Sequence, residues 1–507
     1  MSNSKKIAAV IGYLTIGLNL LYSLLFTPFI LRALGQSEYG VYTLCTSVIS
    51  NLSLLQFGFG TTFIRYYIKY SAEGKRQKAE ELNGMFAEIF GIIGAVTAII
   101  GVLLITNIHT VLGSKITPDE YAITGTLMKI LVFSTVISVL GVPFQALVTA
   151  HEKFVFQKFL QFLETFLKVA VLPPLLLSGY KSVAIVTVSA VLSVITLVSN
   201  AVFVFKKLKV RFRFSNFDFC LFREMGVFSF FIFLQSIMDI FNWQIDRFLL
   251  ARFWGSGEVA VYSVGAQVNT IYISLSGALT SLFVPRANQL VAEGRGNDAL
   301  SALLIKLGRL QFLVCTFLLS AFVFFGRPFV RFFAGAGYEN AYYVAILLIA
   351  PLVLPLSMDL WYHIARAKSL HKTSTTVFTL VAFLNLLISI PLCKRYGEIG
   401  AAAGTCIGMF LANNIFQIWY ARRVVGLDMK LWAKNLLSMT PALIPPAIAG
   451  ISMMLLIRID TIWIFLIFAC LYTAVCAVSF WFFAFTLEEQ NLFAGPARRI
   501  WQKFFHK

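Results

Sequence analysis

RFWGSGEVAVYSV, residues 252–264, repeats RALGQSEYGVYTL, residues 32–44, at a distance of 220 residues. Arg, Gly, Glu, Val and Tyr recur at matching positions in the two stretches. The same offset relates residues 72–75, which read AEGK, to residues 292–295, which read AEGR. A repeat of this length predicts two structurally equivalent halves, and in a membrane protein such halves are typical of transporters.

The composition indicates that the bilayer is the solvent of this chain. Of its 507 residues, 59% are hydrophobic and 13% are charged, and the mean hydropathy is +0.81. Because a water-soluble fold cannot bury so much apolar surface, the sequence predicts an all-α polytopic membrane protein. The first apolar run is too long for a signal-peptide core, so we expect it to be retained as a helix.

Apolar runs of spanning length predict about 14 transmembrane helices, arranged as two pseudo-symmetric six-helix bundles plus two extra C-terminal helices. The predicted domains are a first bundle at 1–210, a second at 211–430, two further helices at 431–486 and a basic amphipathic cytoplasmic tail at 487–507. The predicted spans are 7–34, 41–59, 85–107, 122–149, 159–178, 182–205, 226–251, 259–284, 305–325, 341–364, 373–392, 399–420, 437–457 and 461–485.

The positions of the basic residues orient the chain. Most of the 42 Lys and Arg residues fall in alternate loops and in the two tails, whereas the intervening loops hold few. This bias predicts that both termini are cytoplasmic. It also explains the net charge of +19 without nucleic acid, because basic loops meet anionic lipid head groups. We therefore expect membrane lipids, and no nucleic acid, as partners.

Four polar residues mark one face of the seventh predicted span. Gln235, Asp239, Asn242 and Asp246 recur at helical spacing, and Arg247 follows directly. An ionised carboxylate facing lipid is unfavourable by a few kcal/mol or more, so this face should meet protein or water. Lining a central lumen and holding helices together by hydrogen bonds are both compatible with the pattern.

Other polar residues inside predicted spans are further candidates for the same lumen. Lys129 and Lys168 would suit a phosphate, but Lys168 also follows Glu164 by one turn in the order that favours an internal ion pair. In the first span, Thr15, Asn19 and Tyr22 share one face. The predicted substrate and ion lumen therefore consists of Gln235, Asp239, Asn242, Asp246, Arg247, Lys129, Lys168, Asn19 and Tyr22.

Three further patterns concern packing and bending. In the twelfth span, Gly400, Gly404 and Gly408 predict close helix packing, and the eighth span has a small polar face that is compatible with packing or with lumen lining. That face comprises Gln267, Thr270, Ser274, Gly277 and Ser281. In the tenth span, Pro351 and Pro355 predict a kink, and Asp359 and His363 form an i, i+4 pair suited to proton relay or to a structural contact.

Motifs of soluble enzymes do not occur in this sequence. It lacks a Walker loop, a dinucleotide-binding glycine fingerprint after a strand and a G-x-S-x-G elbow. Its seven cysteines are scattered and form no C-x-x-C pair, which argues against a metal site or a disulfide framework. We therefore expect no enzyme activity, no catalytic residues, no metal and no cofactor.

The first repeat carries a family resemblance. Leu34-Gly35-x-x-Glu38-Tyr39-Gly40-x-Tyr42 resembles the hallmark of the polysaccharide-transporter or O-antigen (lipid-linked oligosaccharide) flippase family. That family lies within the multidrug/oligosaccharidyl-lipid/polysaccharide exporter superfamily. The resemblance extends to Phe57-Gly58-x-Gly60, Arg65-Tyr66, Asp246-Arg247, Gly255 and Tyr262-Ser263, although Gln56 stands where the family often has an acidic residue.

The resemblance implies a function in polysaccharide, lipopolysaccharide O-antigen or capsule biosynthesis. The chain would move undecaprenyl-pyrophosphate-linked oligosaccharide across the bacterial inner membrane by ion-coupled alternating access. Proton and sodium are the candidate coupling ions, and a polysaccharide polymerase is a candidate partner. The resemblance also implies a lumen between two six-helix bundles, which agrees with the repeat.

Other functions stay open at this point. A lipid II flippase or a drug/cation antiporter belongs to the same superfamily, and a passive scramblase or a scaffold would show a similar composition. A membrane glycan polymerase or ligase needs reactive residues on a sizeable outer loop, whereas the longest predicted outer loops, 108–121 and 326–340, are short.

The predicted orientation can be tested by cysteine labelling with a membrane-impermeant reagent. A cysteine placed at Ser114, in the 108–121 loop, should react in intact cells because that loop is predicted to face outward. A cysteine at Gln77 should react only after the cells are opened. Equal labelling of both positions in intact cells would contradict the fourteen-helix topology.

Overall fold

The computed structural model describes residues 12, 14, 17–18, 22–56, 58–108, 117–214, 217–368, 370–456, 459–486 and 489–490. Asn19 and most of the predicted 108–121 loop and 487–507 tail lie outside these residues. All regular elements in the described ranges are helices, which confirms the all-α class.

Contacts divide the chain into two compact units. Unit 1 comprises Met1–Ser263 and Thr375–Thr405, and unit 2 comprises Val264–Ser374 and Cys406–Lys507. Two helices, α11 (Ser256–Ala292) and α16 (His371–Met409), contribute to both units. The other helices of unit 1 are η1 (Tyr22–Phe26), α2 (Thr27–Ser50), η2 (Asn51–Gln56), α3 (Phe59–Ala72), α4 (Arg76–Thr106), α6 (Pro118–Ala150), α7 (Phe154–Leu177), α8 (Lys181–Val202), η3 (Phe203–Leu208), α9 (Phe219–Trp243) and α10 (Ile245–Phe253).

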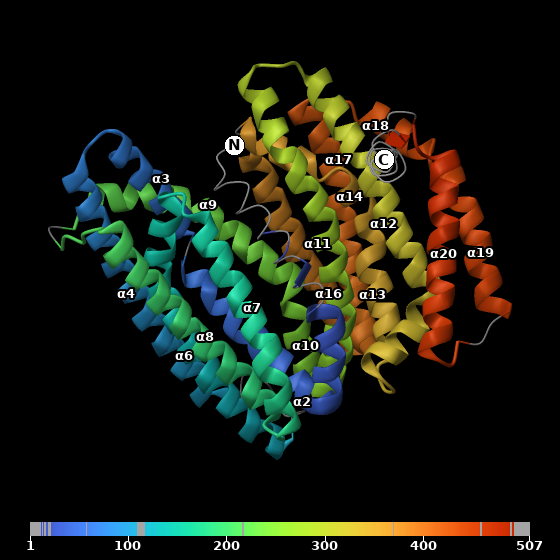
Figure 1. Cartoon of the computed structure of the whole chain (residues 1–507), viewed down its shortest axis with the longest axis horizontal. Coiled ribbons are helices and arrows are strands. Elements are labelled where there is room, and N and C mark those ends of the chain that lie inside the picture. The colour runs from blue at the N-terminus through green and yellow to red at the C-terminus, as the bar shows by residue number, and fades with distance from the viewer. Residues whose placement is uncertain are drawn as a thin grey trace, which may run out of the picture. The chain divides into compact units, whose positions relative to one another are not determined.

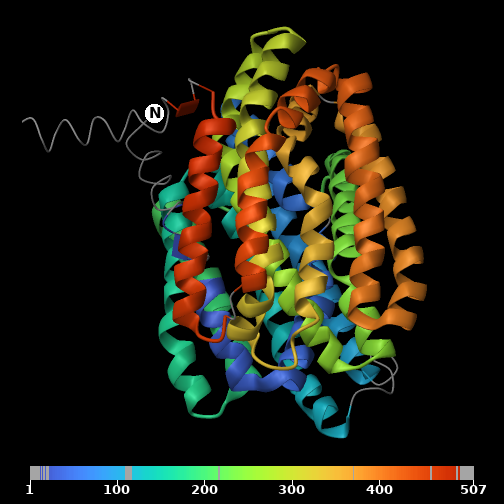
Figure 2. The ribbon, with the colours of Figure 1, turned by 90° about the vertical axis from the view of Figure 1, so that its right-hand side faces the viewer.

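Unit 2 is built around its longest complete helix, α12 (Asn297–Ala334). The extra C-terminal helices α19 (Ile444–Leu456) and α20 (Ile462–Phe483) pack against each other and on α12 (Figure 2). The remaining helices are α13 (Ala341–Ile349), η4 (Ala350–Leu352), α14 (Val353–Ser357), α15 (Leu360–Ala367), η5 (Phe410–Phe416), α17 (Gln417–Tyr420), η6 (Ala421–Val425), α18 (Met429–Leu437) and η7 (Thr440–Leu443).

Length and composition identify the helices that can cross a membrane. Nine helices among the described residues qualify, and ten do if α13–α14 and α15 form one bent span. The chain is therefore a multi-pass membrane protein, while the count of fourteen stays a prediction. The bend is 50° and follows Pro351 and Pro355, as the two prolines predict.

In unit 1, α6 packs against α2, α4 and α8 (Figure 1). The contact with α4 depends on small residues, since a Cβ added to Gly101 would lie 2.4 Å from the Val132 side chain. Such a distance is shorter than any real contact, so a larger residue would push the helices apart.

The sequence repeat reappears as a repeat of backbone geometry at its two hallmark glycines. Gly35 and Gly255, 220 residues apart, have φ angles of 76° and 110°. Only glycine adopts such angles readily. Both residues interrupt the helical backbone at corresponding positions. Gly35 forms a kink within α2, and Gly255 lies between α10 and α11.

The turns that contain the repeated Ala-Glu-Gly sequence, at residues 72–74 and 292–294, also correspond. Helix α3 ends at Ala72 and α11 ends at Ala292, and each is followed by a glycine with positive φ. The backbone N–H of Lys75 donates to Tyr70 O at 3.0 Å, and that of Arg295 donates to Leu290 O at 3.0 Å. The 220-residue offset thus pairs equivalent structural positions in these segments.

Helix α16 folds back on itself at Gly397, where φ is 61°. After this turn, a Cβ added to Gly400 would lie 2.0 Å from Leu392 O, and one added to Gly404 would lie 2.7 Å from Ser389 Cα. The predicted close packing is therefore confirmed for Gly400 and Gly404.

A buried ion pair fixes the segment after α20 to α12. Arg309 Nε and Nη2 donate to the two carboxylate oxygens of Glu489 at 2.9 and 3.0 Å, and Nη2 also donates to Ala484 O at 2.7 Å. The two side chains are 9% and 5% exposed. This two-point geometry satisfies both charges, which a buried pair requires in order to be stable.

The pKa of Glu489 reflects this pairing. Burial raises the pKa, but hydrogen bonds from Arg309 and Thr486 outweigh burial, so the pKa lies below its ordinary value. A carboxyl group with a lowered pKa stabilises the folded state above its unfolded pKa, and this contribution is lost as the pH falls through the folded pKa.

Replacing Glu489 by Gln should lower the free energy of unfolding by roughly 3–5 kcal/mol at neutral pH, because Arg309 would remain buried without its partner charge. The melting temperatures of the two purified proteins in detergent should converge as the pH falls below the lowered pKa of Glu489. Equal melting temperatures at neutral pH would contradict a stabilising pair.

Candidate functional site

The seventh predicted span is two helices rather than one. Helix α9 ends at Trp243 and α10 begins at Ile245, with Gln244 between them. Gln235, Asp239 and Asn242 lie on α9, but their side chains are outside the described part of the chain. Asp246 lies on α10, so the polar residues do not share one uninterrupted helix.

Asp246 is 1% exposed and bonds to two other elements of unit 1. Its Oδ2 accepts hydrogen bonds from the Tyr262 hydroxyl of α11 at 2.5 Å and from the Thr405 hydroxyl of α16 at 2.7 Å. Its Oδ1 is buried and has no hydrogen-bond partner among the described residues. A buried acceptor without a partner is energetically unfavourable, which makes this carboxylate a candidate functional group.

Arg247 extends the same network towards α2. Its Nε donates to Ser263 Oγ at 3.0 Å, and its Nη1 donates to Gln244 Oε1 at 2.8 Å and to Ser47 Oγ at 3.3 Å. The guanidinium therefore connects α10, α11 and α2, which come from both sequence repeats.

The two repeats meet at equivalent residues. Ser263 Oγ donates to Thr43 Oγ1 at 3.2 Å, and these residues are separated by 220 positions. A contact between repeat-equivalent residues is expected on a local pseudo-two-fold axis. We call Thr43, Ser47, Asp246, Arg247, Tyr262, Ser263 and Thr405 the Asp246 cluster.

A second set of contacts lies nearer the start of α11. The Glu120 carboxylate accepts short hydrogen bonds from the hydroxyls of Ser37 and Ser256. Gly40 allows this approach, because a Cβ added to it would lie 1.9 Å from Ser256 O. The backbone of α2 thus reaches α11 directly, and one carboxylate bridges a serine from each repeat.

The predicted lysines do not join the Asp246 cluster. Lys168 forms an ion pair with Glu164 at 2.8 Å on α7. Lys129 is exposed on α6. Tyr22 begins η1, but its side chain is outside the described part of the chain.

Unit 2 has a buried polar cluster that sequence reasoning missed. Gln311 Nε2 donates to Ser276 Oγ at 3.1 Å and to Thr280 Oγ1 at 2.8 Å, and the Thr280 hydroxyl donates to Asp359 Oδ2 at 2.8 Å. A lone glutamine in the long apolar helix α12 was the signal for this cluster. Asp359 is therefore bonded to Thr280 across helices.

The small polar face predicted on α11 is only partly buried. Thr270, Ser274 and Ser281 are exposed, whereas Ser276 and Thr280 beside them are buried. The role of this face, in helix packing or in lumen lining, stays a prediction. No cluster of three or more His, Cys, Asp or Glu residues occurs within the described ranges.

The sequence and the fold have counterparts in known proteins. Residues 7–291 match the model of the family described as "Polysaccharide biosynthesis protein". The chain is 20% identical over 486 residues to the uncharacterized membrane protein EpsK of Bacillus subtilis, covering 94% of each chain. It is 23% identical over 407 residues to a putative O-antigen transporter of Shigella flexneri, covering 78% of this chain and 92% of the relative.

Solved structures share the fold. The lipid II flippase MurJ, in an inward closed conformation, superposes with a TM-score of 0.69 at 15% identity over 93% of this chain and 97% of MurJ. An inward-facing MATE multidrug transporter of the MOP superfamily superposes with a TM-score of 0.63 at 14% identity, over 80% and 95% of the two chains. The solved structures thus show that the chain has a MurJ- and MATE-like fold. Because the family model matches more than half of its length, the chain belongs to the polysaccharide biosynthesis protein family.

Proposed function

We propose that this protein is a flippase for undecaprenyl-pyrophosphate-linked oligosaccharide. It moves this lipid from the cytoplasmic to the outer leaflet of the bacterial inner membrane by ion-coupled alternating access, and both of its termini are cytoplasmic. Membership of a polysaccharide biosynthesis family and resemblance to an O-antigen transporter support the substrate class.

The observation that carries the proposal is the contact between the repeats. Thr43 meets Ser263 through two hydroxyl groups, and one helical turn away Arg247 donates a hydrogen bond to Ser47. Hydroxyl contacts exchange readily for water, because a typical hydrogen bond contributes only about 1 kcal/mol net. The hydrogen bonds of this joint can therefore be exchanged for bonds to water as the joint opens, as alternating access requires.

The physical chemistry of the substrate calls for a polar path. A sugar chain and a pyrophosphate cannot enter hydrocarbon without a large desolvation penalty, whereas the polyprenyl chain is stable there. We assign Gln235, Asp239 and Asn242 to the polar path because they recur along one face of α9. Lys129 and Lys168 are candidates for binding the pyrophosphate, and Asn19 and Tyr22 are further candidates for lining the lumen.

Asp239 and Asp246 have different roles in this proposal. Asp246 and Arg247 hold the joint between the repeats, because their polar atoms bond to α2, α11 and α16. Asp239, about one turn before the end of α9, senses the coupling proton or sodium ion. Neutralising its charge lowers the free energy needed to close the lumen around it, which shifts the inward–outward equilibrium.

The test uses the purified full-length protein in vesicles that contain undecaprenyl-pyrophosphate-linked oligosaccharide. A proton or sodium gradient is imposed, and the substrate in the outer leaflet is measured with a membrane-impermeant glycosidase. We expect movement only with a gradient. Movement without any gradient would indicate a scramblase, preference for lipid II would reassign the substrate, and a covalent glycan product would indicate an enzyme.

In the same assay, Asp239→Asn should insert normally and lose gradient-driven movement. Asp218→Asn is the matched control, because Asp218 accepts a hydrogen bond from Leu221 N at the start of the same helix and asparagine caps a helix equally well. This control should behave like the unmodified protein. Full gradient-driven activity of Asp239→Asn would exclude the coupling role.

A further inference from the structure

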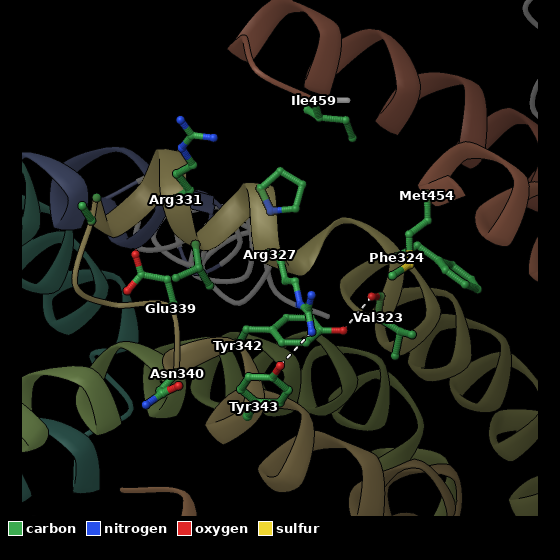
Figure 3. Close-up of a pocket in the computed structure, with 14 residues that line it drawn as sticks. Val323, Phe324, Arg327, Arg331, Glu339, Asn340, Tyr342, Tyr343, Met454 and Ile459 are labelled. Carbon is green, nitrogen blue, oxygen red and sulfur yellow. Dashed lines mark hydrogen bonds between the residues drawn. The ribbon is translucent and has the colours of Figure 1, made fainter. Parts of the chain in front are cut away.

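A pocket in unit 2 combines arginines, tyrosines and an apolar wall. It has a volume of about 810 Å³ and is lined by the C-terminal part of α12, the turn before α13, the first turn of α13 and the end of α19 (Figure 3). We call it the arginine pocket, defined by Arg327, Arg331, Tyr342, Tyr343, Phe324 and Met454.

Arg327 is held in place by both tyrosines. Its guanidinium carbon lies 5.3 Å from the Tyr342 ring centre and 5.5 Å from that of Tyr343. Its Nη2 donates to the Tyr343 hydroxyl at 2.7 Å (Figure 3). Tyr342 is itself fixed, since its hydroxyl donates to Val323 O at 2.9 Å. An arginine held over aromatic rings presents its remaining N–H groups in a fixed fork, the geometry that suits a phosphate.

The pocket lining contains one further arginine, Arg331, and one carboxylate, Glu339. Arg331 follows Arg327 by one helical turn. Among the described residues it forms one ion pair, with Asp460, in which Arg331 Nη1 lies 4.0 Å from Oδ1. Both side chains of this pair are more than two-thirds exposed. Such a pair contributes little. The Glu339 carboxylate already accepts the Gly337 N–H at 3.1 and 3.2 Å. An anion can therefore bind Arg327 without displacing a strong ion pair.

The apolar wall continues the pocket along the membrane-facing side of α19. Helix α19 comes close to α12 because residue 450 is glycine, and a Cβ there would lie 2.2 Å from the Phe324 ring. Beyond this contact, Met454, Leu455 and Leu456 are exposed. Exposed apolar residues at the end of a spanning helix are the surface that hydrocarbon chains cover.

We propose that the arginine pocket binds the phosphate head group of a membrane lipid, with the lipid chain lying along Phe324 and Met454. The predicted orientation places it at the outer leaflet, because the 326–340 loop is predicted to face outward. The site is separate from the polar path on α9 and does not depend on the flippase activity, so it can be tested without transport.

The test measures binding of fluorescent phosphatidic acid to the full-length protein in detergent micelles. Unlabelled dioleoyl phosphatidic acid should compete, whereas dioleoylglycerol and inorganic phosphate should not at the same concentration. Competition by dioleoylglycerol would overturn the phosphate assignment. Equal competition by inorganic phosphate would overturn the lipid assignment and indicate a site for free phosphate.

Variants locate the binding. Arg327→Gln should weaken binding about tenfold or more, since a charge-assisted hydrogen bond is lost, and Tyr343→Phe should weaken it a few-fold by releasing Arg327. Arg366→Gln is the matched control, because Arg366 also lies over a tyrosine, Tyr362 at 5.8 Å, but outside the pocket. Unchanged binding by Arg327→Gln would overturn the proposal, as would an equal loss of binding by Arg366→Gln. The melting temperature of Tyr343→Phe should be unchanged, which would show that its weaker binding is not caused by unfolding.

Discussion

The close approach of α2 to the start of α11 depends on a missing side chain. Because residue 40 is glycine, the α2 backbone can lie against Ser256 O, where a Cβ would be only 1.9 Å away. This approach brings Thr43 within hydrogen-bond distance of Ser263, its equivalent in the second repeat. The stretch at residues 32–44, which carries the family resemblance, therefore contacts its own repeat at residues 252–264.

The surrounding polar groups give this joint its properties. Asp246 fixes Tyr262 and Thr405, and Arg247 reaches Ser263 and Ser47, so the contact has a defined geometry. The proposed function requires this hydroxyl contact to open and close. The buried Arg309–Glu489 pair of unit 2, with both charges satisfied, is by contrast suited to permanent attachment.

The sequence predicted features that depend on pattern and missed those that depend on long-range packing. Glycine spacing predicted the close packing at Gly400 and Gly404, and the 220-residue offset matched Gly35 with Gly255 in the structure. Helical periodicity could not predict the interruption at Gln244, because no proline or glycine lies at that position. This interruption places Asp246 on a separate helix. It could not pair Asp246 with Thr405 or Gln311 with Thr280, because partners so far apart in sequence meet only through the tertiary fold.

The most direct measurement asks whether the repeats must separate at Thr43 and Ser263 during transport. The double variant Thr43→Cys/Ser263→Cys would be oxidised in vesicles, and each single variant would serve as a control for oxidation of the native cysteines. Cleavage of the chain in the basic loop around residues 206–213 reveals the cross-link, since the linked fragments stay together. Substrate movement should stop on oxidation of the double variant alone and return after reduction. Undiminished movement by fully cross-linked protein would contradict an opening of this joint.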